Sequence, residues 1–327
     1  MKWAGLEAVR IENGTNKYYN GATAGGVEMT NTAFCWVRDV ETNGALIGGI
    51  HIALHGAYRC VVRDSHLHHS AYYGFGADCY GICLIAGAAD NLVENNIVRF
   101  VNKPLQFSNS GGGNVVAYNY ADNAWSSPAE FQEVAVDAHC AYPHMELVEG
   151  NWAPHLALPE THGNSGYITF FRNYASSQYR FPAVVGTQTK QTSNVQALSI
   201  GTRSNYVSAV GNVLGPVLNP DSRSAATITQ FICDNAGVGI LSFTTDGTPS
   251  RQTSAYATAW LHGNYDTVNR ATQWKAGNTQ RIIPASLYLS GKPAWWPAGN
   301  PWPWTGPDLS PMVGPLPAKT RADALAP

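Results

Sequence analysis

A short phrase recurs seven times between residues 35 and 214, and it limits the possible folds more than any other feature of the sequence. Each copy has eight residues, and five successive copies carry Asn at the sixth position. The copies are CWVRDVET (35–42), CVVRDSHL (60–67), NLVENNIV (91–98), NVVAYNYA (114–121), ELVEGNWA (146–153), ITFFRNYA (168–175) and VSAVGNVL (207–214). Such internal repetition predicts a solenoid in which every copy forms part of one stacked rung.

The positions within the phrase indicate how a rung is oriented. The third position is always apolar and the eighth almost always, which predicts two columns that face the core. The fifth position varies freely, and the fourth is expected to face solvent. The repeated Asn suits a turn, and its amide can bind the identical amide of the next rung, so we expect an asparagine ladder. The shortest spacings, 22 to 25 residues, predict the bare rung, and the longer ones leave residues for loops.

This pattern predicts an all-β chain folded as a right-handed parallel β-helix with long loops. An antiparallel sandwich would need tight Asn-Gly hairpins between consecutive strands, and the strands are too widely spaced for them. Cys35 and Cys60 share one column, one rung apart, and we expect buried thiols there rather than a disulfide. Six cysteines in 327 residues do not form a disulfide framework.

Charge and hydropathy exclude some partners. A formal charge of −2 argues against nucleic acid and against an anionic membrane surface. No apolar run approaches the roughly 20 residues that a membrane span needs. The first residues, MKWAGLEAVR, lack the apolar centre of a signal peptide, although an extracellular or periplasmic location is expected for the function considered below.

Several longer phrases resemble a known group of proteins. EGNWAPH, HGNSGYITFFRN, HGNYD and IPASLYLSGKPAWW, with rungs that turn on Asn, resemble bacterial right-handed β-helix proteins of the pectate-lyase-like superfamily. The resemblance extends over about residues 5–305. It implies the fold and a polysaccharide or oligosaccharide partner, but the superfamily includes lyases, hydrolases and phage tailspikes. The Asp-Asp and Gly-His-Gly motifs of polygalacturonases and the Arg-x-Pro-x-x-Arg of calcium-dependent pectate lyases are absent, so no catalytic residue is carried over.

The composition changes near residue 283, where the chain becomes rich in Pro and Trp. We therefore divide it into a β-helix domain, 1–282, and a C-terminal extension, 283–327, that packs on the helix and covers a flank or an end. The alternative is a platform on which sugars stack, built from Trp295, Trp296, Trp302 and Trp304.

Polar residues gather in one stretch, 139–175, which holds four His and three Glu. Hydrolysis of a glycosidic bond needs two carboxyl groups separated by about 5–9.5 Å. Glu149 is the favoured catalytic residue, paired with Asp137 or Glu160, because the residues stacked above and below it, Ala117 and Phe171, bring no cation. His139, His144 and His162 are expected to tune these acids or to bind sugar hydroxyls.

Three other functions remain open for the same stretch. In β-elimination from a uronic acid, His162 would be the base, Tyr167 would assist, and Arg172 would bind the substrate carboxylate. Asp137 with Glu160 could begin a Ca²⁺ site for such a lyase. Hydrolysis is favoured narrowly, because residues 130–175 contain one Arg and no Lys. Without catalysis, Trp152, Tyr167 and Tyr174 would serve a glycan-binding β-helix, and a pure protein scaffold would bind no sugar.

A second polar cluster lies in RDSHLHHS, where Asp64, His66, His68 and His69 follow one another closely. Its spacing permits metal binding, but a solvated turn is the favoured interpretation. No resident metal and no cofactor are expected.

Overall fold

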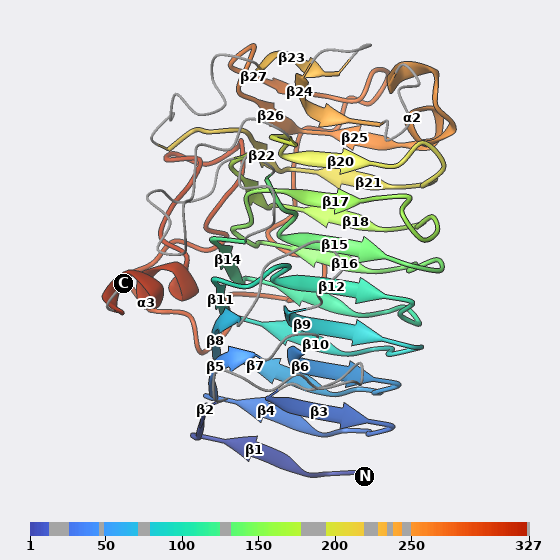
Figure 1. Ribbon diagram of the computed structural model, residues 1–327. Helices are drawn as coiled ribbons and strands as arrows, with labels where there is room; N and C mark the ends of the chain where they lie inside the picture. Colours follow the sequence, from blue (N-terminus) through green and yellow to red (C-terminus); the bar gives the residue numbers. More distant parts are fainter. Residues whose placement is uncertain are drawn as a thin grey trace.

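The computed structural model describes residues 1–12, 26–45, 49–70, 79–124, 132–177, 194–218, 228–233, 238–243 and 250–325. These residues form three stacked sheets and little helix (Figure 1). The helical elements are η1 (Ser250–Gln252), α2 (Ser254–Thr258) and α3 (Pro317–Ala324). In the part of the chain that is described, no helix combines the length and the hydrophobicity required to cross a bilayer.

The strands divide among the sheets as follows. The first sheet contains β1 (Gly5–Glu7), β4 (Trp36–Arg38), β7 (Val61–Arg63), β10 (Leu92–Glu94), β13 (Val115–Ala117), β16 (Leu147–Glu149), β18 (Thr169–Phe171), β21 (Ser208–Val210) and β25 (Trp260–His262). The second has two parts, connected among the described residues only by single bridges through Trp152. The first part contains β2 (Arg10–Glu12), β5 (Glu41–Ala45), β8 (His66–Ser70), β11 (Ile97–Arg99) and β14 (Tyr120–Asp122). The second part contains β19 (Tyr174–Ala175), β22 (Val213–Leu214), β26 (Asn264–Asp266) and β27 (Ala271–Gln273). The third contains β3 (Val27–Thr30), β6 (Ile50–His55), β9 (Tyr80–Ile85), β12 (Leu105–Ser108), β15 (Val136–His139), β17 (Leu156–Leu158), β20 (Leu198–Ile200), β24 (Val238–Ser242) and β23 (Ile228–Ile232).

The chain visits the first, second and third sheets in turn and then returns to the first, one position further along. Neighbouring strands pair in parallel, and among the described strands only β26 and β27 pair antiparallel. The seven repeated phrases supply consecutive strands of the first sheet, from β4 to β21, as the repeat predicts. This path is compatible with a parallel β-helix, and it contradicts an antiparallel sandwich.

The columns read from the sequence form the core. All seven residues of the third position and all seven of the eighth are buried. Val62 at the third position, for example, pairs with Val37 on one side and Val93 on the other. Cys35 and Cys60 are buried free thiols, as expected.

The asparagine ladder is present and buried. The side-chain amides of Asn96, Asn119, Asn151, Asn173 and Asn212 each donate to the Oδ1 atom of the next, at 2.9–3.1 Å, and Asn264 ends the run. Each Oδ1 also accepts the backbone N–H of the preceding Asn, so the turn satisfies polar groups that would otherwise be lost in the interior.

The freely varying fifth position has a conformational explanation. All seven residues at this position adopt left-handed backbone angles, with φ between 47° and 67°. They are Asp39, Asp64, Asn95, Tyr118, Gly150, Arg172 and Gly211. Gly, Asn and Asp tolerate this conformation well. Tyr118 and Arg172 do not share that tolerance, and both side chains are held by the C-terminal segment.

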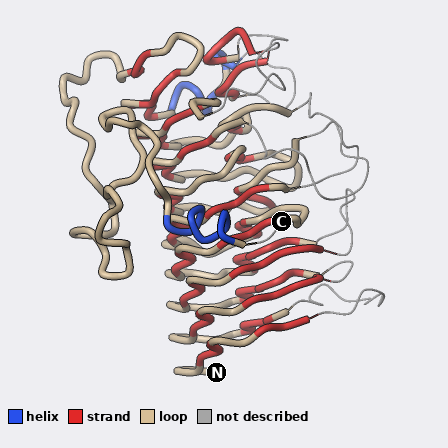
Figure 2. Tube along the Cα trace, turned by 90° about the vertical axis from the view of Figure 1, so that its left-hand side faces the viewer, coloured by secondary structure: helices blue, strands red, loops and turns tan. Residues whose placement is uncertain are grey.

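The expectation that the fourth position faces solvent is wrong for the middle of the column. Glu94, Ala117, Glu149 and Phe171 are all buried there. The cause is the C-terminal segment, residues 283–325, which runs back along the earlier rungs and brings α3 beside β11 and β14 (Figures 1 and 2). Arg63 lies 3.4 Å from Glu94 in this column, and the carboxylate of the pair is buried.

The C-terminal segment covers a flank, and its tryptophans do not form an open platform. Trp296 and Trp304 are only 3% and 1% exposed. Trp304 Nε1 donates to the carbonyl oxygen of Gly150, and Trp302 Nε1 donates to Tyr118 Oη. These indoles therefore seal the flank against the rungs.

Candidate functional site

The third sheet places two of the predicted site residues on its outer face. Along β15, Val136 and Ala138 point into the core, so Asp137 and His139 point away from it. One rung earlier, Gln106 lies beside Asp137 and Ser108 lies beside His139.

Asp137 is fully buried and is held as a carboxylate. Its Oδ2 accepts hydrogen bonds from Lys103 Nζ at 2.8 Å and from Gln106 Nε2 at 3.0 Å. Burial opposes ionisation, but Lys103 and then His139 hold the pKa of Asp137 below its usual range. The carboxylates of Asp137 and Glu133 raise the pKa of Lys103 in return, against the effect of burial. An ionised, enclosed Asp137 is unsuited to act as a general acid or to contact a substrate.

His139 connects this buried pair to the surface. Its Nδ1 lies 3.4 Å from Asp137 Oδ2, and its side chain is 14% exposed. The ring meets that of His162 edge to face, with centroids 4.8 Å apart, and His162 itself is exposed. A carboxylate behind an imidazole can hold the ring in one orientation, which suits His139 to exchange a proton with a substrate.

Glu160 follows β17 at the same corner of the rung. Its Oε1 accepts from Thr202 Oγ1 at 2.6 Å and from the backbone N–H of Arg203 at 2.7 Å. The Lys103 ammonium on Asp137 gives no support to the Ca²⁺ site considered from the sequence, because a cation already neutralises one of its two carboxylates.

Exposed aromatic side chains lie on the turns that follow strands of the third sheet. Tyr167 stacks on Tyr206, with centroids 4.9 Å apart, and about half of each side chain is exposed. Tyr142 stacks on His144 at 5.8 Å. A Cβ atom at Gly166 would come within 2.5 Å of Tyr142 Oη, so the absence of a side chain at Gly166 allows Tyr142 to pack against the backbone next to Tyr167. The corner therefore combines imidazoles with apolar ring faces.

Glu149 does not belong to this corner, and the expectation that its carboxylate is available is wrong. Glu149 lies in β16 of the first sheet and is buried. Its Oε1 accepts from Tyr118 Oη at 3.0 Å, and its Oε2 accepts from the backbone N–H of Leu287 at 2.9 Å. Burial raises the pKa of Glu149 although these hydrogen bonds oppose the shift. Its contacts anchor the C-terminal segment.

Arg172, Trp152 and Tyr174 lie at the same covered flank rather than with the histidines. Arg172 is buried and binds Asp308 through two hydrogen bonds. Trp152 stacks on Trp304 at 6.0 Å and meets the buried ring of Tyr174 edge to face. Of the aromatic residues considered for glycan binding, Tyr167 is the one that remains well exposed.

Lys103, Gln106 and Tyr206 are the site residues that the sequence did not indicate. Gln106 could have been found by continuing the register to the third sheet, where it stacks under Asp137. Lys103 lies before β12, outside the repeated phrase, and no sequence signal connects it to Asp137.

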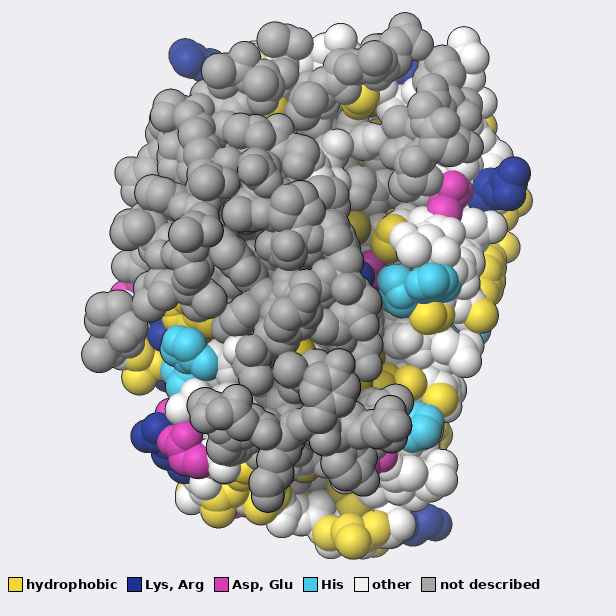
Figure 3. Space-filling model, viewed as in Figure 1, with side chains coloured by type: hydrophobic (Ala, Val, Ile, Leu, Met, Phe, Trp, Pro, Cys, Tyr) yellow, Lys and Arg dark blue, Asp and Glu magenta, His cyan; other side chains and the backbone are white. Residues whose placement is uncertain are grey.

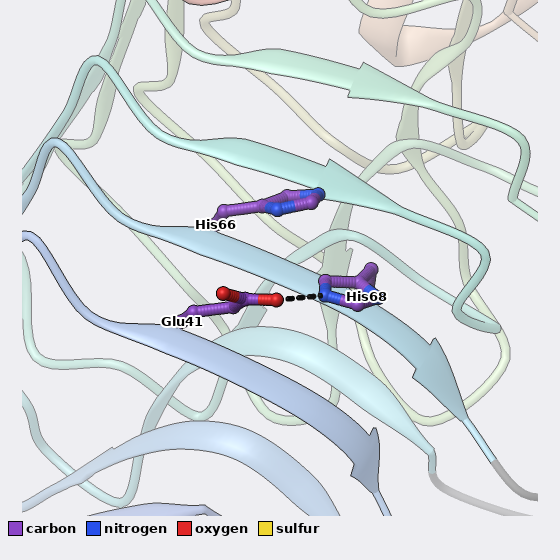
Figure 4. Close-up of side chains that lie close together, drawn as sticks. All are labelled: Glu41, His66 and His68. Atoms are coloured by element: carbon purple, nitrogen blue, oxygen red, sulfur yellow. Dashed lines mark hydrogen bonds and ion pairs between the residues drawn. The ribbon is translucent and has the colours of Figure 1, made fainter. Parts of the chain in front are cut away.

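The second polar cluster is not a solvated turn, because His66, His68 and His69 lie on strand β8. His66 and His68 project from the same face of β8, and Glu41 projects from β5 beneath them (Figure 4). His68 Nε2 lies 3.0 Å from Glu41 Oε1, and His68 Nδ1 lies 2.6 Å from His69 Nδ1. Burial lowers the pKa of His66 to about 3 and lowers that of His68, so both rings are neutral at pH 7.

Histidines occur at both edges of the face seen in Figure 3, each with acidic side chains close by.

Comparison of the chain with protein-family models, with curated proteins and with solved structures found no match. The functional argument therefore depends on the geometry of these residues.

Proposed function

We propose that this chain is a right-handed parallel β-helix related in architecture to the pectate-lyase-like superfamily, and that it cleaves a polysaccharide at the corner formed by His139 and His162. The observation that carries the proposal is the position of His139, which lies between the buried Asp137 carboxylate and exposed His162. This arrangement provides a base oriented by a carboxylate next to a second imidazole. The exposed rings of Tyr167 and Tyr206 supply apolar faces against which sugar rings can pack.

The contacts favour β-elimination over the hydrolysis preferred from the sequence. Two-carboxylate hydrolysis needs a protonated acid facing the substrate, whereas Asp137 is ionised and enclosed. In elimination, His139 removes the proton at C5 of a uronic acid, and the electron pair forms the C4–C5 double bond. The C4–O bond then breaks, and His162 protonates the leaving oxygen. Asp137 acts as a positioning residue for His139.

A uronic acid also requires a cation for its carboxylate. Arg172 cannot supply it, because its guanidinium binds Asp308. Arg203 is exposed and lies at the same corner, since its backbone N–H binds Glu160. We therefore assign the substrate carboxylate to Arg203.

Hydrolysis remains a second candidate because Glu160, a half-buried carboxylate, lies at this corner. A water activated by His139 would then attack the sugar, and Glu160 would be the acid. Both reactions imply an extracellular or periplasmic protein, where polysaccharides are met.

Mass spectrometry of the products from a panel of neutral and acidic polysaccharides tests the proposal. Elimination gives unsaturated fragments, and hydrolysis gives fragments that are heavier by one water. If no fragments form but the polysaccharides bind, the protein is a glycan-binding β-helix. If no fragments form and no polysaccharide binds, the proposed carbohydrate function is wrong.

A further inference from the structure

We propose that Glu41, His66 and His68 form a binding site for a divalent transition-metal ion such as Zn²⁺. The site lies on the outer face of the second sheet, whereas His139 and His162 belong to the third sheet and the turn that follows it. The proposal is therefore independent of the polysaccharide cleavage proposed above.

The spacing of the donor atoms suits one ion. A carboxylate oxygen of Glu41 and one ring nitrogen from each histidine all lie within 4.8 Å of one another. In a tetrahedral site with bonds of about 2.0–2.2 Å to zinc, two donors lie about 3.4 Å apart, so the side chains must turn toward one another to close the site. Because His66 and His68 are two apart on a strand, the backbone already directs both rings to one side (Figure 4).

One ring nitrogen of the cluster is buried and, within the described part of the chain, lacks a hydrogen-bond partner. His66 Nε2 is buried and has no hydrogen-bond partner among the described residues. Such a buried nitrogen costs stability unless something binds it. The rings of His66 and His68 stack with centroids 4.2 Å apart. Both rings would have to rotate from this stacked position to direct one nitrogen each at a shared ion.

His69 contacts the ring nitrogen of His68 that would not bind the metal. The 2.6 Å contact between the Nδ1 atoms of His68 and His69 requires that one of them donate a proton. The Nε2 atom of neutral His68 donates to the Glu41 carboxylate, so its Nδ1 atom accepts from His69. When a metal replaces that Nε2 proton, His69 keeps the His68 ring in place through the same Nδ1 contact. This is the outer hydrogen bond that usually fixes the tautomer of a metal-binding histidine, which makes His69 a positioning residue.

Two arginines lie close to the proposed metal site and affect which further ligand the metal would bind. Arg10 Nε lies 3.6 Å from Glu41 Oε1, and Arg99 occupies the position beside His68 on the next rung. Arg10 also pairs with Glu12, so it can leave Glu41 to the ion. A metal held by three protein ligands would keep a position open, and a groove lined by Arg10, Asp64, His66 and Arg321 reaches this point. The arginines favour an anionic ligand at that open position.

The donor set selects the class of ion. Two imidazoles and one carboxylate suit Zn²⁺, Co²⁺, Ni²⁺ and Cu²⁺, whereas Ca²⁺ and Mg²⁺ prefer sites made only of oxygen. We therefore expect little binding of Ca²⁺ at concentrations that saturate the site with Zn²⁺.

Equilibrium dialysis of the full chain against Zn²⁺, after removal of metal with EDTA, tests the site. About one Zn²⁺ should bind per chain, and Co²⁺ in its place should give the visible absorption of a four- or five-coordinate ion. His66→Ala, His68→Ala and Glu41→Gln should each weaken binding at least about tenfold, and His69→Ala should weaken it about tenfold.

His55→Ala is the matched control, because it removes an imidazole from the third sheet and should leave Zn²⁺ binding unchanged. His66→Gln keeps a polar side chain of similar size if the alanine variant fails to fold. Circular dichroism and thermal melts establish folding, and Zn²⁺ should raise the melting temperature of the wild type but not of the His66 variants. Failure of the wild type to bind Zn²⁺ or Co²⁺, or binding that survives both histidine substitutions, would overturn the proposal.

Discussion

Arg172 and Asp308 lie 136 residues apart in the chain and are joined by two parallel hydrogen bonds, of 2.9 Å and 2.7 Å. Arg172 also donates to the carbonyl oxygens of Ile283, Pro284 and Thr305. One buried guanidinium therefore binds the C-terminal segment at two places, residues 283–284 and residues 305–308. A planar group with five donors can do this, and lysine cannot.

Replacement of Arg172 by alanine should destabilise the fold by about 2–3 kcal/mol, because it leaves buried carbonyls and the Asp308 carboxylate without their partner. Arg38, in an exposed ion pair with Glu7, provides the control. Arg38→Ala should cost no more than about 1 kcal/mol. Urea unfolding of both variants measures the difference, and equal losses would show that the segment is not anchored through Arg172.

Asn151 lies in the middle of the ladder and should be difficult to replace. Its Oδ1 accepts from the backbone and the side chain of Asn119, and its amide donates to Val116 and Asn173. Asn151→Ala leaves these groups buried without partners, and we expect a loss of about 3 kcal/mol in the free energy of unfolding. The half-buried Asn278, whose Oδ1 accepts the backbone N–H of exposed Gln280, gives a control whose alanine variant should lower the free energy of unfolding by no more than about 1 kcal/mol.

Glu146 should make the wild type less stable as the pH rises. Burial raises the pKa of Glu146 to about 7, against the hydrogen bonds from Ser110 and Asn114. Because the folded state keeps this proton when the unfolded state has released it, the contribution of Glu146 falls between about pH 4.5 and pH 7 and amounts to about 3 kcal/mol.

The buried histidines oppose this trend, because the pKa values of His51 and His155 are lowered by burial to about 3. Their contribution rises with pH, so the wild-type curve alone does not isolate Glu146. The stability of the wild type relative to Glu146→Gln should fall by about 3 kcal/mol as the pH increases from 4.5 to 7 in urea unfolding. A difference that stays constant with pH would contradict the raised pKa.

The stacked strands and the asparagine ladder could be predicted from the sequence because the core residues and the Asn residues repeat at fixed positions of the phrase. Val62, Asn119 and Ala153 lie where their positions in the phrase predict. The covered flank could not be predicted in the same way. The exposure of Glu149 is decided by Leu287, which no period connects to it, and the chemistry of Asp137 is decided by Lys103. Contacts between distant segments of different composition leave no periodic signal.

Tyr167 should contribute to polysaccharide affinity through its exposed ring. Tyr167→Ala should weaken binding by about 2- to 10-fold, the range expected for the loss of one aromatic contact of about 0.5–1.5 kcal/mol. Tyr58 is similarly exposed on an earlier rung and gives the control, since Tyr58→Ala should leave affinity unchanged. Affinity electrophoresis in gels that contain the polysaccharide measures both, and equal retardation of the two variants would argue against a binding role for Tyr167.

The most direct test of the proposed activity compares the products of the wild type, His139→Ala and His55→Ala on the same polysaccharide panel. His55 occupies the outward column of His139 on an earlier rung, so its variant controls for the loss of an imidazole. We predict unsaturated fragments from the wild type and from His55→Ala, and at least a 100-fold lower rate from His139→Ala. Fragments formed equally by all three proteins, or by none of them, would contradict catalysis by His139.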